Sequence, residues 1–255
     1  MGRKTSRPQT SKNRPLIVNI LISSSPAITV RSKLRQYPRV HGALVHALSL
    51  GRGDGKYEES FRAAMFECIC PGDCVWDVGA NVGLYSELFA AAVGPSGQVI
   101  SFEPSLECVA IIEERRQSSP AGASWEVIAG ALSDEDGDAW LSVADGCTAA
   151  RNHLASRAGA STVPVRTYRA DSIVAAGNTA PAVIKIDVEG FEGEVFDGMT
   201  SVLNLPSLRA LCVEVHFRAL NERGKPHEPT RLVQLVEAHN FTVKWTDVSH
   251  FVARR

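Results

Sequence analysis

Short apolar runs alternate with stretches of helical spacing from residue 74 onward, and this alternation limits the possible folds more than any other feature of the chain. The expected strands are 74–78, 98–102, 125–132, 163–168, 182–188, 210–216, 241–245 and 250–253. The expected helices are 57–69, 82–93, 106–116, 194–203 and 231–239. Such alternation is typical of an α/β fold, a parallel sheet with helices on both faces. Ligands of these sheets bind at the carboxyl ends of the strands, so we expect the chemistry there.

The alternation is interrupted between the third and fourth expected strands. An acidic turn at 134–137 predicts that 139–143 folds back as a hairpin partner of the strand before it. Small polar residues at 144–162 then predict a long loop.

The first part of the chain has a different composition from the rest. Residues 1–53 contain ten Lys and Arg residues and no acid. We expect a disordered basic tail at 1–15, a partly helical or irregular extension at 16–56, and the α/β domain at 57–255. A solvated tail is favoured over an arm for nucleic acid or a membrane surface. Only a short apolar run occurs in the extension, and no run reaches the ~20 residues that span a bilayer.

Charge and cysteine usage exclude several classes of partner and compartment. Lys plus Arg is 27 and Asp plus Glu is 28, so we expect no nucleic-acid partner for the molecule as a whole. The six cysteines are scattered and form no CxxC pair, which favours reduced thiols and a cytoplasmic location. The cluster at 68–74 has no second ligand pair, so we do not expect zinc there.

The turn after the first expected strand predicts a nucleoside-binding site. Gly79 and Gly83 allow the backbone to approach a ligand closely, and Ala80 lies between them. Asn81 stands where the dinucleotide fingerprint requires glycine. Asp77 at the strand tip would repel a pyrophosphate but attract an ammonium, and S-adenosyl-L-methionine has an ammonium, a sulfonium and no phosphate. The alternative is a tight strand–helix turn with Asp77 as a cap.

Two later strand ends extend the same interpretation. Glu103 closes the second expected strand, where an acid can accept both ribose hydroxyls of a nucleoside. Pro104 fixes the turn that follows. Ala131 and Leu132, near the end of the third expected strand, offer small side chains and backbone amides that could frame an adenine edge. The alternative for each is an ordinary exposed strand end.

Charged residues occupy alternate positions at two further strand ends. Lys185, Asp187 and Glu189 fall on one side of a central strand, where buried charges are costly unless they are paired or used. Glu214 and His216 close the next strand in the same way. The alternative is a structural Lys–Asp pair, acids at a helix start and a hydrogen-bonded histidine. We expect these side chains to gather at one edge of the sheet.

The ordered motifs DVGANVG, FEP, ALSD, IKIDVEGFE and VEVH resemble the FkbM-type family of S-adenosylmethionine-dependent methyltransferases. The resemblance covers roughly 57–255. It implies the Rossmann-like class I methyltransferase fold, with seven strands of which the last is antiparallel. It also implies O-methylation of a hydroxyl on a sugar, polysaccharide or polyketide-type product. The implied cofactor contacts are Asp77, Gly79, Asn81, Gly83 and Glu103.

The chain departs from the family pattern in two places. Asp171 is preceded by Arg-Ala, where relatives often read more like LDSL. Residues 1–56 have no obvious counterpart. We expect the acceptor pocket to be walled by 16–56, 144–162 and 218–230.

Methyl transfer to an alcohol needs a base, and the charged strand ends supply candidates. Asp187 is the first candidate base, Glu189 the next and His216 the alternative. Lys185 is expected to keep Asp187 ionised, because a nearby cation lowers a carboxyl pKa. A divalent metal held by Asp187, Glu189 and Glu214 is an alternative way to acidify the hydroxyl, although no metal is the default expectation.

Three other functions fit parts of the pattern. A nicotinamide-dependent oxidoreductase is opposed by the missing central glycine and by Asp77. A nucleic-acid methyltransferase is opposed by the absence of an (N/D)PP(Y/F) signature and by the acidic core. A non-catalytic nucleoside-binding module is opposed by the polar residues retained at Asp187 and His216.

Overall fold

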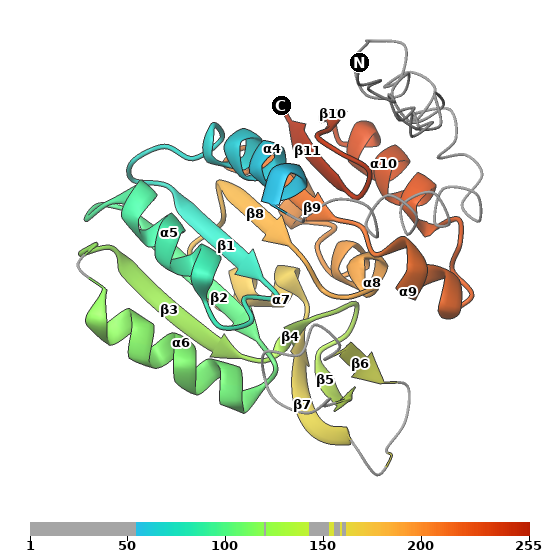
Figure 1. Ribbon diagram of the computed structural model, residues 1–255, viewed down its shortest axis with the longest axis horizontal. Helices are drawn as coiled ribbons and strands as arrows, with labels where there is room; N and C mark the ends of the chain where they lie inside the picture. The colour runs from blue at the N-terminus through green and yellow to red at the C-terminus, as the bar shows by residue number, and fades with distance from the viewer. Residues whose placement is uncertain (1–54, 120, 143–152, 156–158, 160–161) are drawn as a thin grey trace, which may run out of the picture.

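The computed structural model describes residues 55–119, 121–142, 153–155, 159 and 162–255 (Figure 1). The expected basic tail at 1–15 and nearly all of the expected extension at 16–56 lie outside the described residues. So does most of the segment 144–162.

A seven-stranded sheet forms the centre of the molecule, in the order β10-β11-β9-β8-β1-β2-β3. Its strands are β1 (Cys74–Val78), β2 (Gln98–Glu103), β3 (Ser124–Ala129), β8 (Val183–Ile186), β9 (Ala210–Glu214), β10 (Thr242–Trp245) and β11 (His250–Arg254). The last strand, β11, runs antiparallel to both of its neighbours, and the other neighbouring pairs are parallel. The expected class I methyltransferase sheet is therefore confirmed, including its antiparallel final strand.

Helices cover both faces of this sheet, as expected (Figure 1). They are α4 (Gly55–Phe66), α5 (Leu84–Val93), α6 (Leu106–Ser118), α7 (Ala170–Ala175), α8 (Glu192–Asp197), α9 (Phe217–Glu222) and α10 (Glu228–Ala238), with a 3-10 turn at Val202–Asn204. Successive strand residues point to opposite faces. Val75 accordingly packs with Phe89 and Ile112 of α5 and α6, whereas Trp76 packs with Phe196 of α8 on the other face.

The segment 125–132 is not one strand, which corrects the expectation. β3 ends at Ala129, and Ala131–Leu132 forms β4 in a second, four-stranded sheet. Gly130 lies between the two, and a Cβ atom there would lie 2.6 Å from the Tyr168 ring and 3.0 Å from the carbonyl oxygen of Arg166. The chain therefore leaves the central sheet at a position where only glycine fits against Tyr168 and the Arg166 carbonyl.

The second sheet has the order β4-β7-β5-β6 and lies beyond the carboxyl ends of β2 and β3 (Figure 1). Its longer strands are β5 (Gly137–Ser142) and β7 (Thr162–Tyr168), and β6 (His153–Ala155) falls inside the expected loop. The expected hairpin partner is wrong, because β5 pairs with β6 and β7 rather than with the strand before it.

Several element ends also differ from expectation. The helix expected at 194–203 stops at Asp197, and a separate 3-10 turn follows at Val202–Asn204. Gly198, just after the helix, packs so closely that an added Cβ would lie 1.9 Å from the Ser133 carbonyl oxygen. The strands expected at 182–188 and 210–216 end at Ile186 and Glu214, so the polar residues beyond them sit in loops at the carboxyl edge. Helices α7 and α9, each six residues long, were not expected. Among the described residues no helix combines the length and apolarity needed to cross a membrane.

Candidate active site

The turn after β1 packs directly on the loop after β8. Gly79 has φ +76°, and a Cβ atom there would lie 1.9 Å from the carbonyl oxygen of Asp187. The amides of Gly79 and Ala80 both donate to the Phe102 carbonyl, at 3.0 and 3.1 Å, which ties the turn to the end of β2. Gly83, also at φ +76°, starts α5. Three strand ends are thus held against one another by a turn that needs glycine at Gly79.

Glu103 braces the same turn from the end of β2. Its carboxylate accepts hydrogen bonds from the amides of Asn81 and Ser105, both at 2.8 Å. Burial raises the pKa of Glu103 to about 7, although both amides favour its ionised form. A carboxylate oxygen can accept more than one hydrogen bond, so both oxygens retain capacity for ligand hydroxyls. The sequence-predicted ribose acid is therefore placed beside the glycine turn, where that role is possible.

Asp77 does not face the site, which corrects the expectation that its carboxylate meets a ligand's ammonium. The side chain is fully buried. One oxygen accepts from the Lys185 ammonium at 3.2 Å, and the other accepts from the Ser86 hydroxyl at 2.6 Å. Ser101 and the Trp125 indole extend that hydrogen-bond chain through the core. The ammonium that Asp77 binds is therefore that of Lys185 and not that of a ligand.

Lys185 is likewise buried and connects the strand ends. Its ammonium lies 3.4 Å from an Asp187 oxygen and 3.5 Å from the Gly79 carbonyl oxygen. Burial lowers the pKa of Lys185, but the charges of Asp77 and Asp187 outweigh burial and raise it above the usual value. Lys185 therefore stays charged beside Asp187. Its charge lowers the pKa of Asp187, the direction expected from the sequence, but burial outweighs that effect.

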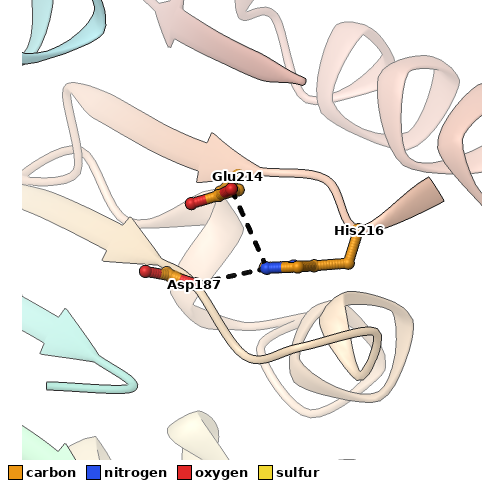
Figure 2. Close-up of side chains that lie close together, drawn as sticks. All are labelled: Asp187, Glu214 and His216. Carbon is orange, nitrogen blue, oxygen red and sulfur yellow. Dashed lines mark ion pairs between the residues drawn. The ribbon is translucent and has the colours of Figure 1, made fainter. Parts of the chain in front are cut away.

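His216 lies among the carboxylates at this edge. Its Nε2 atom is 3.3 Å from Glu189, 3.6 Å from Asp187 and 3.9 Å from Glu214. Figure 2 shows Asp187, Glu214 and His216 pointing toward one another from the ends of β8 and β9. Burial lowers the pKa of His216, but the hydrogen bonds of Glu189 and Glu192 outweigh it and raise that pKa well above the usual value. The side chains expected at one edge of the sheet are brought together there.

The two carboxylates nearest His216 have different electrostatic surroundings. Burial raises the pKa of Asp187, and the positive charges of Lys185 and His216 offset this only in part. Burial also acts to raise the pKa of Glu214, but a hydrogen bond from His250 outweighs it and the pKa falls to about 2. The pKa of Glu214 is therefore held low, whereas that of Asp187 is raised.

Three supporting residues were missed by the sequence analysis. Glu192 is fully buried, and its Oε1 atom lies 2.6 Å from Nδ1 of His216. His250 Nε2 lies 3.2 Å from Glu214, and Asp247 lies 2.9 Å from the other ring nitrogen of His250. Glu192 did not stand out in the sequence, because an acidic residue is common in the first turn of a helix. Asp247 and His250 reach the site only through the antiparallel pairing of β11 with β9.

The other residues predicted to contact the cofactor also lie at this edge, but burial limits which of their atoms can meet a ligand. Leu132 and Ala80 are buried in the core, so only their backbone can meet a ligand there. Ala131 and Pro104 are partly exposed at the ends of β4 and β2. Within the described residues, one cluster of metal-ligating type is present, formed by Asp187, Glu214 and His216.

Comparison with known proteins gives a family match over most of this region. The sequence model of the methyltransferase FkbM domain matches residues 77–243. The chain is 34% identical over 146 residues to the hexuronic acid methyltransferase AglP of Haloferax volcanii, which is 56% of this chain and 56% of that protein. The chain thus spans little more than half the length of this curated relative.

Solved structures with a similar arrangement include two complexes with methyl-transfer cofactors. One is Aeropyrum pernix fibrillarin with bound S-adenosyl-L-methionine (TM-score 0.46, 12% identity, 76% of this chain and 74% of that chain). Another is an O-methyltransferase from Bacillus cereus in complex with SAH (TM-score 0.46, 12% identity, 94% of this chain and 95% of that chain).

Proposed function

The chain belongs to the FkbM methyltransferase family, and from this premise we propose that it is an S-adenosyl-L-methionine-dependent O-methyltransferase acting on a hydroxyl of a sugar, polysaccharide or natural-product acceptor. The match to a hexuronic acid methyltransferase favours a sugar among these acceptors. We assign the transferase domain to residues 57–255. The cysteines in the described residues are thiols rather than disulfides, which supports a cytoplasmic location.

The observation that carries this proposal is the excess of carboxylates beside the glycine turn. Asp187, Glu189 and Glu214 are all partly exposed at the edge, whereas Lys185 is buried and shared between two acids. A pyrophosphate would be repelled there, while a sulfonium and an ammonium would be attracted. The negative charge that was expected from Asp77 is thus supplied by other carboxylates at the same edge of the sheet.

The cofactor fits this edge as follows. Glu103 accepts the ribose hydroxyls, and the backbone of the turn from Gly79 to Gly83 packs against the nucleoside. Pro104, Ala131 and the backbone of Leu132 border the adenine. Asp187 and the other carboxylates around His216 would receive the methionine part with its sulfonium.

The reaction is an in-line displacement. The acceptor oxygen attacks the methyl carbon, the carbon–sulfur bond breaks with its electron pair moving to sulfur, and S-adenosylhomocysteine leaves. Holding the two reactants in line supplies up to ~7–11 kcal/mol of the barrier reduction. Asp187 is the first candidate for taking the hydroxyl proton, because its carboxylate is partly exposed at this edge and burial raises its pKa. Glu189 is the next candidate and His216 the alternative.

A binding comparison followed by product analysis tests this function. The full chain is titrated with S-adenosylhomocysteine and with NAD, and then incubated with S-adenosyl-L-methionine and a panel of glycosides, polysaccharide fragments and polyketides. We expect saturable binding of S-adenosylhomocysteine alone and a product heavier by one methylene. Binding of NAD alone would support the nicotinamide oxidoreductase. Cofactor binding with no product from any acceptor class would support a non-catalytic nucleoside-binding module.

A further inference from the structure

We propose that the loops after β8 and β9 form a divalent-cation site with Asp187, Glu214 and His216 as its protein ligands. The role given to the cation below rests on the proposed methyl transfer, whereas the site itself does not. Each of the three residues offers one ligand atom, and these atoms all lie within 4.8 Å of one another. Two carboxylate oxygens and one imidazole nitrogen suit Mg²⁺ or Mn²⁺ with the remaining positions taken by water and substrate.

The separations between the ligand atoms leave room for a bound ion. Two ligands bound at about 2.1 Å lie about 3.0 Å apart when adjacent and about 4.2 Å apart when opposite. Nε2 of His216 lies 3.6 Å from an oxygen of Asp187 and 3.9 Å from an oxygen of Glu214. These distances are too long for good hydrogen bonds and fall between the two octahedral values. β8 and β9 are hydrogen-bonded neighbours, so the sheet fixes the relative positions of the ligands.

Each ligand is held from behind by a different residue. The second oxygen of Asp187 faces the Lys185 ammonium at 3.4 Å. The second oxygen of Glu214 faces His250 at 3.2 Å. The supporting contacts leave one oxygen of each carboxylate directed toward His216, as Figure 2 shows. Outer contacts of this kind orient metal ligands in proteins.

Glu192 completes this support from behind His216. Its 2.6 Å contact engages Nδ1 and leaves Nε2 facing Asp187 and Glu214, where a bound cation would take the place of the Nε2 proton. A ligating histidine typically donates its other N–H to a carboxylate in this way. The second oxygen of Glu192 is buried with no hydrogen-bond partner.

The cation has a defined task in the proposed reaction. Bound to the acceptor oxygen, it lowers the pKa of the hydroxyl. Glu189 lies outside the set of three ligands, and its side chain is more exposed than that of Asp187 or Glu214. With Asp187 engaged as a ligand, Glu189, the second candidate base, would take the hydroxyl proton while the oxygen attacks the methyl carbon and the carbon–sulfur bond breaks with its electron pair on sulfur.

Titration of the full chain with Mn²⁺ alone tests the site, with loss of the free Mn²⁺ paramagnetic resonance signal as the readout. We expect one saturable site in the wild-type chain and at least tenfold weaker binding in Asp187→Asn and in Glu214→Gln. Glu222→Gln is the matched control, because this carboxylate lies on α9, just after His216, but is exposed and paired with Arg218. It should bind Mn²⁺ as the wild type does. Thermal unfolding of each variant establishes that it is folded.

Two results would overturn the site: no saturable Mn²⁺ binding by the wild type, or binding that folded Asp187→Asn and Glu214→Gln leave unchanged. Neither depends on methyl transfer, so a chain with no transferase activity can still pass or fail this test. Where methyl transfer occurs, excess EDTA should abolish it and added Mg²⁺ or Mn²⁺ should restore it. Transfer at the full rate in EDTA would contradict the role of the cation.

Discussion

Lys185 places its ammonium nitrogen 3.2 Å from a carboxylate oxygen of Asp77, and both side chains are buried in the centre of the sheet. The two residues are register partners on the paired strands β1 and β8. The pair therefore holds the two strand ends whose loops build the site, and Lys185 extends the link to Asp187.

Removing one member of this pair should strongly destabilise the protein. Lys185→Met leaves the Asp77 charge buried without its cation, and we expect a loss of about 3–5 kcal/mol in unfolding free energy. Arg166→Met is the control, because it breaks the exposed Arg166–Asp138 pair and should leave the urea midpoint unchanged. The double variant Asp77→Asn/Lys185→Met should lose less than the sum of its single variants. Additive losses would show that the two charges do not depend on each other.

Gly79→Ala should damage the site through a clash rather than through backbone strain alone. The new methyl group would lie 1.9 Å from the Asp187 carbonyl oxygen. Gly94→Ala is the matched control, because Gly94 also has positive φ but has no atom within 4 Å of an added Cβ. We expect Gly94→Ala to cost about 1 kcal/mol in unfolding free energy and Gly79→Ala about 1–3 kcal/mol more. Only Gly79→Ala should weaken S-adenosylhomocysteine binding, and equal effects would mean that the two loops do not press on each other.

Glu103 should make the stability of the ligand-free protein depend on pH. Its pKa is about 7 in the folded chain, against a usual value of 4.5. As pH rises, the unfolded chain loses this proton first, so the stabilisation is complete below about pH 4.5 and is lost between 4.5 and 7. Thermal midpoints at pH 5 and pH 8 should therefore differ more for the wild type than for Glu103→Gln. An unchanged difference in the variant would show that Glu103 does not titrate in this range.

Much of the fold could be predicted from the sequence because the central strands are nearly continuous buried apolar runs. β8 is an example, with all four residues from Val183 to Ile186 buried. The break at Gly130 could not be predicted, since its cause is contact with Tyr168 on a distant strand. The short helices α7 and α9 are similarly held by their surroundings and lack the length that makes a helical pattern visible.

The site was predicted less completely than the fold, and Asp77 illustrates the reason. Strand polarity correctly brought Asp187, Glu214 and His216 to one edge. Spacing along one strand did not show that Asp77 lies opposite Lys185, a relationship that depends on which strands are neighbours. The same limitation hid His250, whose place beside Glu214 comes from the register of β11 with β9.

The most direct test of the proposed active site is Asp187→Asn, studied for cofactor binding and methyl transfer together. The substitution keeps the size of the side chain and removes the charge proposed to take the hydroxyl proton, while Glu189 and Glu214 remain to attract the ammonium of the nucleoside. We predict S-adenosylhomocysteine affinity within about threefold of wild type, and transfer of labelled methyl groups to the acceptor reduced by about 10²–10⁴-fold. Full methyl transfer by a folded Asp187→Asn chain would contradict the assignment of catalysis to this edge of the sheet.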